Sequence, residues 1–173
     1  MGPSPRTAAL AAAALAAVVL TLPTAARAGE GEHAFTLAPR YAAMLGPDED
    51  AHGVGLAFGY AFGLSDFFTL IADAGYAVLP AEVEHLAWVR VGATYTIDAI
   101  EWVPWLGLAV GGYLVPDADA RFDGGASVGG GIDYRPQRSW SIGADVWYHA
   151  LFAHLDRIPA TLTAGLRVTW YLE

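Results

Sequence analysis

The sequence predicts an all-β fold: an eight-stranded antiparallel up-and-down β-barrel that crosses a membrane. Three observations support this fold class. The segment His52–Leu64 alternates large side chains with glycine or alanine. Hydrophobic residues make up 55% of the chain and charged residues 16%, and the mean hydropathy is +0.37. No stretch after the N-terminal segment is long and apolar enough for a spanning helix. A membrane chain without such a helix satisfies its backbone hydrogen bonds in a closed barrel.

The alternation in His52–Leu64 separates two faces, because successive side chains of a strand point in opposite directions. Valine, leucine, phenylalanine and tyrosine fall on one face, and glycine and alanine fall on the other. A half-buried strand of a soluble protein would pair its apolar row with polar residues. We therefore expect the large face to meet lipid and the small face to line a narrow barrel.

The first 28 residues have the features of a cleaved signal peptide. Arg6 precedes the apolar run Ala8–Leu22, and Ala26-Arg27-Ala28 supplies the small residues that a signal peptidase recognises. We expect cleavage after Ala28, export, and a barrel domain of residues 29–173. The alternative is a transmembrane anchor, which the short, alanine-rich run disfavours.

The first half of the exported chain shows four alternating segments separated by turn sequences. A glycine- and proline-containing acidic turn follows the first segment, a tight reversal follows the second, and a short loop that begins at Pro80 follows the third. The expected strands are Ala34–Leu45, His52–Leu64, Phe67–Leu79 and His85–Ile97.

The second half repeats the pattern, with turns at Asp98–Trp102, Pro116–Asp119, Arg135–Arg138 and near Leu155–Arg157. The segment Phe122–Tyr134 has the weakest strand signal, because it is rich in glycine, which lowers strand propensity. The expected strands are Val103–Val115, Phe122–Tyr134, Trp140–Phe152 and Thr161–Leu172.

An even number of strands places both ends of the exported chain on one side, the periplasmic side. The four connections on the outer side are rich in carboxylates, so we expect an acidic outer rim. Its members are Asp48, Glu49, Asp50, Glu82, Glu84, Asp117, Asp119 and Asp156.

Three segments at strand ends carry a resemblance to a known family: Tyr60–Asp66, Tyr95–Asp98 and Pro104–Leu108. With the signal peptide, they make the chain similar to the small outer-membrane β-barrels of the OmpA/OmpX type. The resemblance implies a place in the bacterial outer membrane and insertion by the barrel-assembly machinery. Members usually end on an aromatic residue, whereas this chain ends Trp170-Tyr171-Leu172-Glu173.

Seven ionisable residues fall on the inward face of the strands. An eight-stranded barrel is filled by side chains, so charges inside it must pair. Counting along the hairpins places Asp145 opposite Arg167 and Asp73 beside Arg90. We expect an interior ion-pair network, with a proton or ion pathway as the alternative. The seven residues are Arg40, Asp73, Arg90, Asp133, Asp145, His149 and Arg167.

Catalysis is a weaker hypothesis. Asp145 and His149 share the inner face, but residues four apart on a strand lie about 13 Å apart. Some barrels of this size are lipid A-modifying hydrolases that use serine, histidine and an acid. Ser127, Ser139 and Ser141 are not expected near His149, so the sequence supplies no catalytic, cofactor-binding or metal-binding residues.

The formal net charge is −9. Removing Arg6 and Arg27 leaves 7 arginines against 18 acids, or −11, which disfavours nucleic acid as a partner. The cluster Asp48–Asp50 could bind Mg²⁺ or Ca²⁺ and bridge to lipopolysaccharide phosphates, but a solvated rim is the simpler interpretation. The chain contains no cysteine.

These observations together predict a monomeric outer-membrane barrel with a structural or surface role, no open pore and no cofactor. Outer-membrane lipids and lipopolysaccharide are its expected partners. The alternatives are a lipid-modifying enzyme and, if the interior holds a cavity, a narrow channel or a carrier of small apolar ligands.

Overall fold

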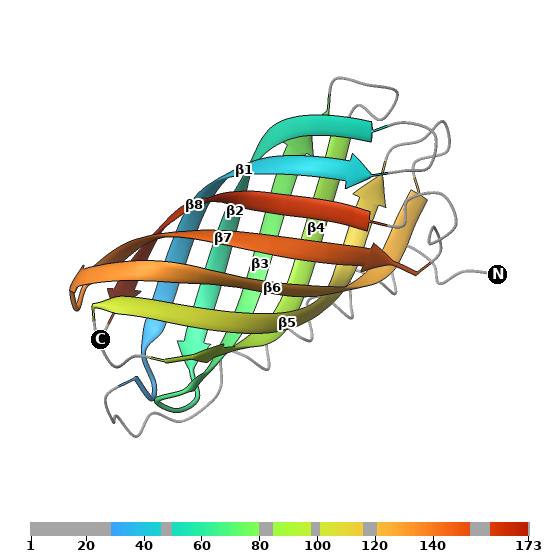
Figure 1. Ribbon diagram of the computed structural model, residues 1–173. Helices are drawn as coiled ribbons and strands as arrows, with labels where there is room; N and C mark the ends of the chain where they lie inside the picture. The colour runs from blue at the N-terminus through green and yellow to red at the C-terminus, as the bar shows by residue number, and fades with distance from the viewer. Residues whose placement is uncertain are drawn as a thin grey trace.

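The computed structural model describes residues 29–45, 50–79, 85–97, 101–115, 121–152 and 160–172. Within them, eight antiparallel strands pair in chain order, and β1 also pairs with β8 to close the barrel (Figure 1). The predicted fold class is therefore confirmed. The strands are β1 His33–Leu45, β2 Asp50–Gly63, β3 Phe68–Val78, β4 His85–Thr96, β5 Trp102–Val115, β6 Arg121–Gln137, β7 Trp140–Leu151 and β8 Ala160–Leu172.

The end of β6 differs from the sequence-based expectation. A turn was expected at Arg135–Arg138, but β6 continues to Gln137 and the turn occupies Arg138 and Ser139. The register with β7 shifts between Tyr134 and Gln137. Pro136 lies in this irregular stretch, where its missing N–H costs no ladder bond.

The outer surface carries the large apolar row of each strand. Val54 is 70% exposed, Leu106 69% and Leu108 67%, and comparable side chains surround the barrel. An exposed apolar surface of this extent is unstable in water and fits the hydrocarbon of a membrane. None of the described residues belongs to a helix that is long and apolar enough to cross a membrane.

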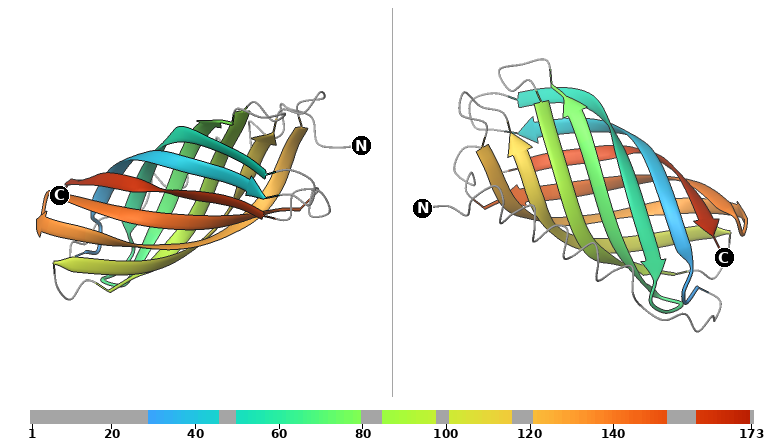
Figure 2. Two further views of the ribbon diagram at one scale, coloured as in Figure 1. Left: turned by 45° about the horizontal axis from the view of Figure 1, so that its top comes forward. Right: turned by 180° about the vertical axis from the view of Figure 1, so that it is seen from behind.

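The two ends of the barrel differ. His33 pairs with Leu172, so the described chain enters and leaves at one end, called here the terminal end (Figure 2). The opposite, far end is filled by large apolar side chains. This apolar plug consists of Met44, Leu79, Leu86, Trp88, Tyr113 and Leu151, each buried.

Glycine makes room for the ring of the plug's tryptophan. Gly75 lies opposite Trp88 in the ladder, and a Cβ at that position would overlap the indole ring. The small inward row therefore allows bulky residues from the neighbouring strand to fill the barrel.

Several sequence-based predictions fall outside the described residues. They include the signal peptide in residues 1–28 and most of the acidic rim, and for Asp50 only the backbone is described, at the start of β2. The rim residues concerned are Asp48, Glu49, Glu82, Glu84, Asp117, Asp119 and Asp156.

Candidate functional site

Charged side chains meet in pairs in the middle of the barrel. Arg90 of β4 lies directly opposite Asp73 of β3. Its Nε donates to Asp73 Oδ1 over 3.0 Å, and its Nη2 donates to Oδ2 over 2.8 Å. This two-pronged pair is the one that hairpin counting predicted. Such geometry satisfies a carboxylate that is largely removed from water.

The other two pairs each reach across an intervening strand. Arg40 of β1 pairs with Asp145 of β7, and Arg167 of β8 pairs with Asp133 of β6. Glycine occupies the position between the partners in both cases: Gly165 lies between Arg40 and Asp145 in the register. An arginine can cross a strand there because no side chain stands in its path.

The expected pairing of Asp145 with Arg167 is wrong. Asp145 lies opposite Gly165, and Arg167 lies opposite Gly143, so the two charged residues are offset by two positions. Gly143 is the gap over which Arg167 reaches Asp133. The expected residues do form a network, but two of its ion pairs join strands that are separated by one other strand.

Two tryptophans connect the arginines. The rings of Trp105 and Trp147 lie 5.6 Å apart. The Arg90 guanidinium lies 4.4 Å from the Trp147 ring centroid, and the Arg167 guanidinium lies 4.6 Å from that of Trp105. Arg90 and Arg167 thus each have a carboxylate and an aromatic face as partners, which stabilises a cation removed from water.

His149 lies among hydroxyl groups between the charged pairs and the plug. Its Nδ1 is 2.9 Å from Ser127 Oγ and 3.0 Å from Tyr113 OH, and its Nε2 is 2.9 Å from Thr163 Oγ1. The expectation that Ser127 is remote from His149 is therefore wrong, because the two are direct register partners. Ser139 lies in the β6–β7 turn, and Ser141 pairs with Tyr171 through a 3.1 Å hydrogen bond.

The serine–histidine contact lacks two features of a hydrolase. The ring nitrogen that would be oriented by a carboxylate faces Thr163 instead. Ser127 and His149 are also both buried inside the barrel, away from its lipid-facing surface. Both oxygens of Asp145 are bonded to Arg40 instead of to His149. The described residues contain no group of three or more side chains suited to a metal ion.

A cavity of about 140 Å³ occupies the terminal half of the barrel. Small residues of β1 and β2 line one side of it, Trp105 of β5 and Trp147 of β7 line another, and the three ion pairs also border it. The cavity extends to the turn at Ser65 and Asp66. Its small-residue wall consists of Ala34, Ala38, Ala57, Gly59, Ala61 and Gly63.

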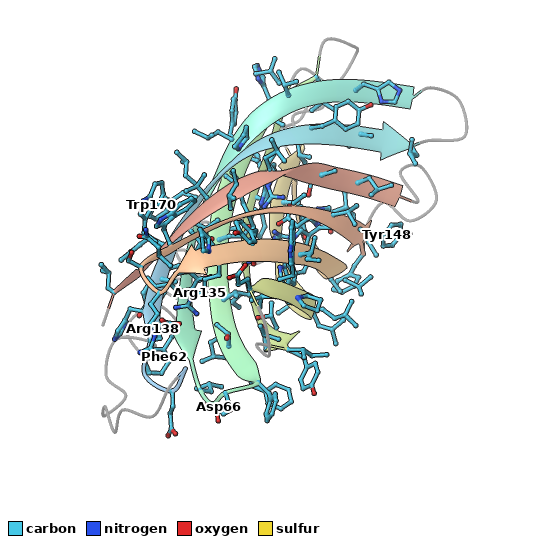
Figure 3. The ribbon with its side chains drawn as sticks, turned by 60° about the vertical axis from the view of Figure 1, so that its left-hand side comes forward. Phe62, Asp66, Arg135, Arg138, Tyr148 and Trp170 are labelled. Carbon is cyan, nitrogen blue, oxygen red and sulfur yellow. The ribbon has the colours of Figure 1, made fainter. Side chains whose placement is uncertain are left out.

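A fourth ion pair lies at the mouth of the cavity. Arg135 Nη2 donates to Glu32 Oε1 over 2.5 Å, and its guanidinium lies 3.8 Å from the ring centroid of Tyr171. Arg135 and Asp66 both appear toward the terminal end in Figure 3, with Tyr148 toward the far end. The backbone of residues 31 and 32 is bonded to Gly63, which fixes this entry segment against β2.

Comparison with known proteins identifies the fold. No protein-family model matches the chain, and no curated protein matches its sequence. Neisserial surface protein A matches with a TM-score of 0.67 and 13% identity, over 82% of this chain and 99% of that one. The N-terminal β-barrel domain of OprF from Pseudomonas aeruginosa matches with a TM-score of 0.59 and 14% identity, over 83% and 99%.

The attachment invasion locus protein Ail of Yersinia pestis gives a TM-score of 0.57 and 15% identity, over 83% of this chain and 99% of that one. At these identities the likeness concerns the fold alone. The chain therefore has the fold of the small eight-stranded transmembrane β-barrels, as the resemblance in its sequence indicated.

Proposed function

We propose that the chain is an integral barrel of the bacterial outer membrane with a structural or surface role and no open pore. The observation that supports a closed barrel most strongly is the apolar plug at the far end. Its members are buried and come from β1, β4, β5 and β7 and from the residue after β3. Water and ions would have to displace packed side chains to cross it.

The membrane location is supported by the exposed apolar surface and by the similarity to outer-membrane proteins. The predicted signal peptide adds the export step. Lipopolysaccharide and phospholipid are the proposed contacts of the outer surface, with divalent cations bridging the acidic rim, and the barrel-assembly machinery is the proposed partner during insertion.

Conductance measurement tests the closed barrel. The purified protein is reconstituted into planar lipid bilayers, with a porin as the positive control. We expect no current above that of a protein-free bilayer. Stable, protein-dependent current steps would contradict the proposal.

A lipid-product assay tests the enzymatic alternative separately. The reconstituted protein is incubated with phospholipid and lipopolysaccharide, and released fatty acid is measured. We expect no release above background. Release that is abolished by Ser127→Ala or His149→Ala would establish catalysis and reject the structural role.

A further inference from the structure

The entry segment, residues 29–32, holds the first residue of the expected mature chain against the end of β2. The Gly31 N–H donates to the Gly63 carbonyl over 2.8 Å, and the Gly63 N–H donates to the Glu32 carbonyl over 2.9 Å. The ion pair between Glu32 and Arg135 ties the same segment to β6. None of these bonds uses a residue before Gly29, so cleavage after Ala28 leaves them in place.

Gly29 lies beside Asp66 of the β2–β3 turn. A Cβ built on Gly29 would lie 3.5 Å from Asp66 Oδ1 and 3.8 Å from the carbonyl oxygen of Ser65. The Gly29 nitrogen is bonded to the same Cα, so it lies about 2.5 Å from that Cβ position and within about 6 Å of Asp66 Oδ1. Because glycine has no Cβ, rotation about its Cα–C bond can bring a free amino group into the Cβ position.

Signal-peptide cleavage changes the charge at this position. Hydrolysis of the Ala28–Gly29 peptide bond consumes one water and converts a neutral amide into a carboxylate on Ala28 and an ammonium on Gly29. The Asp66 side chain is exposed in its turn, and none of the ion pairs between described residues includes it. The new positive charge is therefore formed next to an acid that has no cation among these pairs.

We propose that cleavage after Ala28 creates an ion pair between the Gly29 ammonium and the Asp66 carboxylate, with the Ser65 carbonyl as a second acceptor. All three residues line the cavity where it reaches the terminal end, so the pair holds the entry segment at the cavity mouth. The turn thus captures the amino terminus of its own chain, and the uncleaved chain lacks the charge that this requires. The proposal rests on the predicted cleavage site and is independent of the structural role proposed above.

The first test determines where the mature chain begins. The full-length precursor is expressed in a bacterium with an outer membrane, and the membrane-inserted protein is analysed by mass spectrometry. The mass should correspond to a chain that starts at Gly29. A mature chain that starts at any other residue overturns the proposal, because its amino group would not lie beside Asp66.

The second test measures the pKa of the terminal amine. The chain contains no lysine, so the amine of Gly29 is the only primary amine of the mature protein. Reductive methylation with isotope-labelled formaldehyde preserves its charge and gives an NMR signal that can be followed with pH in detergent micelles. Two opposite charges about 4 Å apart in water should change the proton affinity about five-fold, so Asp66→Asn should lower the pKa of the amine by about 0.7.

Other acids near the amine provide the controls. Glu30 is adjacent in the chain, and Glu32 is already bonded to Arg135. Glu101 is exposed in the β4–β5 connection at the same end of the barrel. Glu101→Gln should lower the pKa of the amine by less than about 0.2 at physiological salt, because separated exposed charges are screened.

An amine whose pKa is the same in Asp66→Asn as in the wild type overturns the proposal. A Glu30→Gln variant that lowers this pKa as much as Asp66→Asn also overturns it, because the partner would not be specific to the β2–β3 turn. Folding of each variant is checked by its migration on gels with and without heating. If Asp66→Asn does not fold, Asp66→Ser removes the same charge and should give the same fall in pKa.

Discussion

Replacing Arg40 with methionine tests whether the ion pairs that reach across strands stabilise the barrel. Arg40 donates a hydrogen bond to each oxygen of the Asp145 carboxylate, and the Asp145 side chain is only 1% exposed. Arg167, which lies two positions along the neighbouring strand, is already bonded to both oxygens of Asp133. The variant therefore leaves a buried carboxylate without a partner, which costs about 3–5 kcal/mol.

The double variant Arg40→Met/Asp145→Leu removes both charges and replaces them with apolar groups. Such replacements are often neutral or stabilising, so its stability should lie within about 1.5 kcal/mol of the wild type. Arg138→Met is the control, because Arg138 lies exposed in the β6–β7 turn and its loss should change stability by less than about 0.5 kcal/mol.

The assay is equilibrium unfolding by guanidinium of protein inserted in lipid vesicles, followed by tryptophan fluorescence and extrapolated linearly to water. A cost below about 1 kcal/mol for Arg40→Met would show that Asp145 is solvated or finds another cation. A double variant as unstable as the single one would show that the loss of stability does not arise from the unpaired charge. Either result would refute the reasoning.

Three further predictions concern lipid exposure, the glycine gap and the rim. Leu106→Arg places a charge on the lipid-facing side of β5 and should lower the free energy of unfolding by about 2–4 kcal/mol. The control Phe67→Arg, in the β2–β3 turn, should lower it by about 1 kcal/mol or less in the same assay. Equal losses of stability would contradict the assigned faces. Gly143→Ala places a methyl group against the Asp133 carboxylate and should lower the free energy of unfolding by about 2 kcal/mol. Gly124→Ala is the control and should leave stability nearly unchanged. A Gly143→Ala variant as stable as the wild type would show that Arg167 can reach Asp133 without a glycine between them. Removing Mg²⁺ and Ca²⁺ with a chelator should lower the melting temperature only in vesicles that contain lipopolysaccharide, and an unchanged value there would exclude cation bridging by the rim.

The direction in which each interior residue points could be predicted from the sequence. Large and small side chains alternate along the strands, and a pairing error of two residues leaves every side chain on its own face. All seven expected ionisable residues are therefore inside, and Asp73 meets Arg90 because a short connection joins their strands. The fold class follows from the same alternation.

The partners of the other charges could not be predicted, because they depend on where each hairpin is centred. The β7–β8 pairing lies two residues from the expected one, so Asp145 faces glycine and not Arg167. The irregular end of β6 moves the β6–β7 pairing further from the expected one than the β7–β8 pairing is moved. A turn centred on Pro136 and Gln137 would place Ser127 opposite Val146, whereas the shifted register brings it to His149.

The cavity is a property of the packed barrel and not of any single segment. Small residues occur on the inward face of most strands, but those of β6 lie beneath bulky rings from neighbouring strands: Gly129 lies beneath the Trp147 ring, and Gly131 lies against the Trp105 ring. On β1 and β2 no such ring covers the small row next to Gly59. Only the three-dimensional pairing shows which of these rows remains uncovered.

The most direct test of the account measures which side chains touch lipid. In lipid nanodiscs, nuclear Overhauser effects between side-chain methyl groups and acyl-chain protons should be strong for Leu106, Leu108 and Val110. They should be absent for Leu86 and Leu151 in the plug. Acyl-chain contacts at the plug methyl groups, or none at the three β5 residues, would contradict a barrel that turns its large apolar row to lipid and closes its interior with packed side chains.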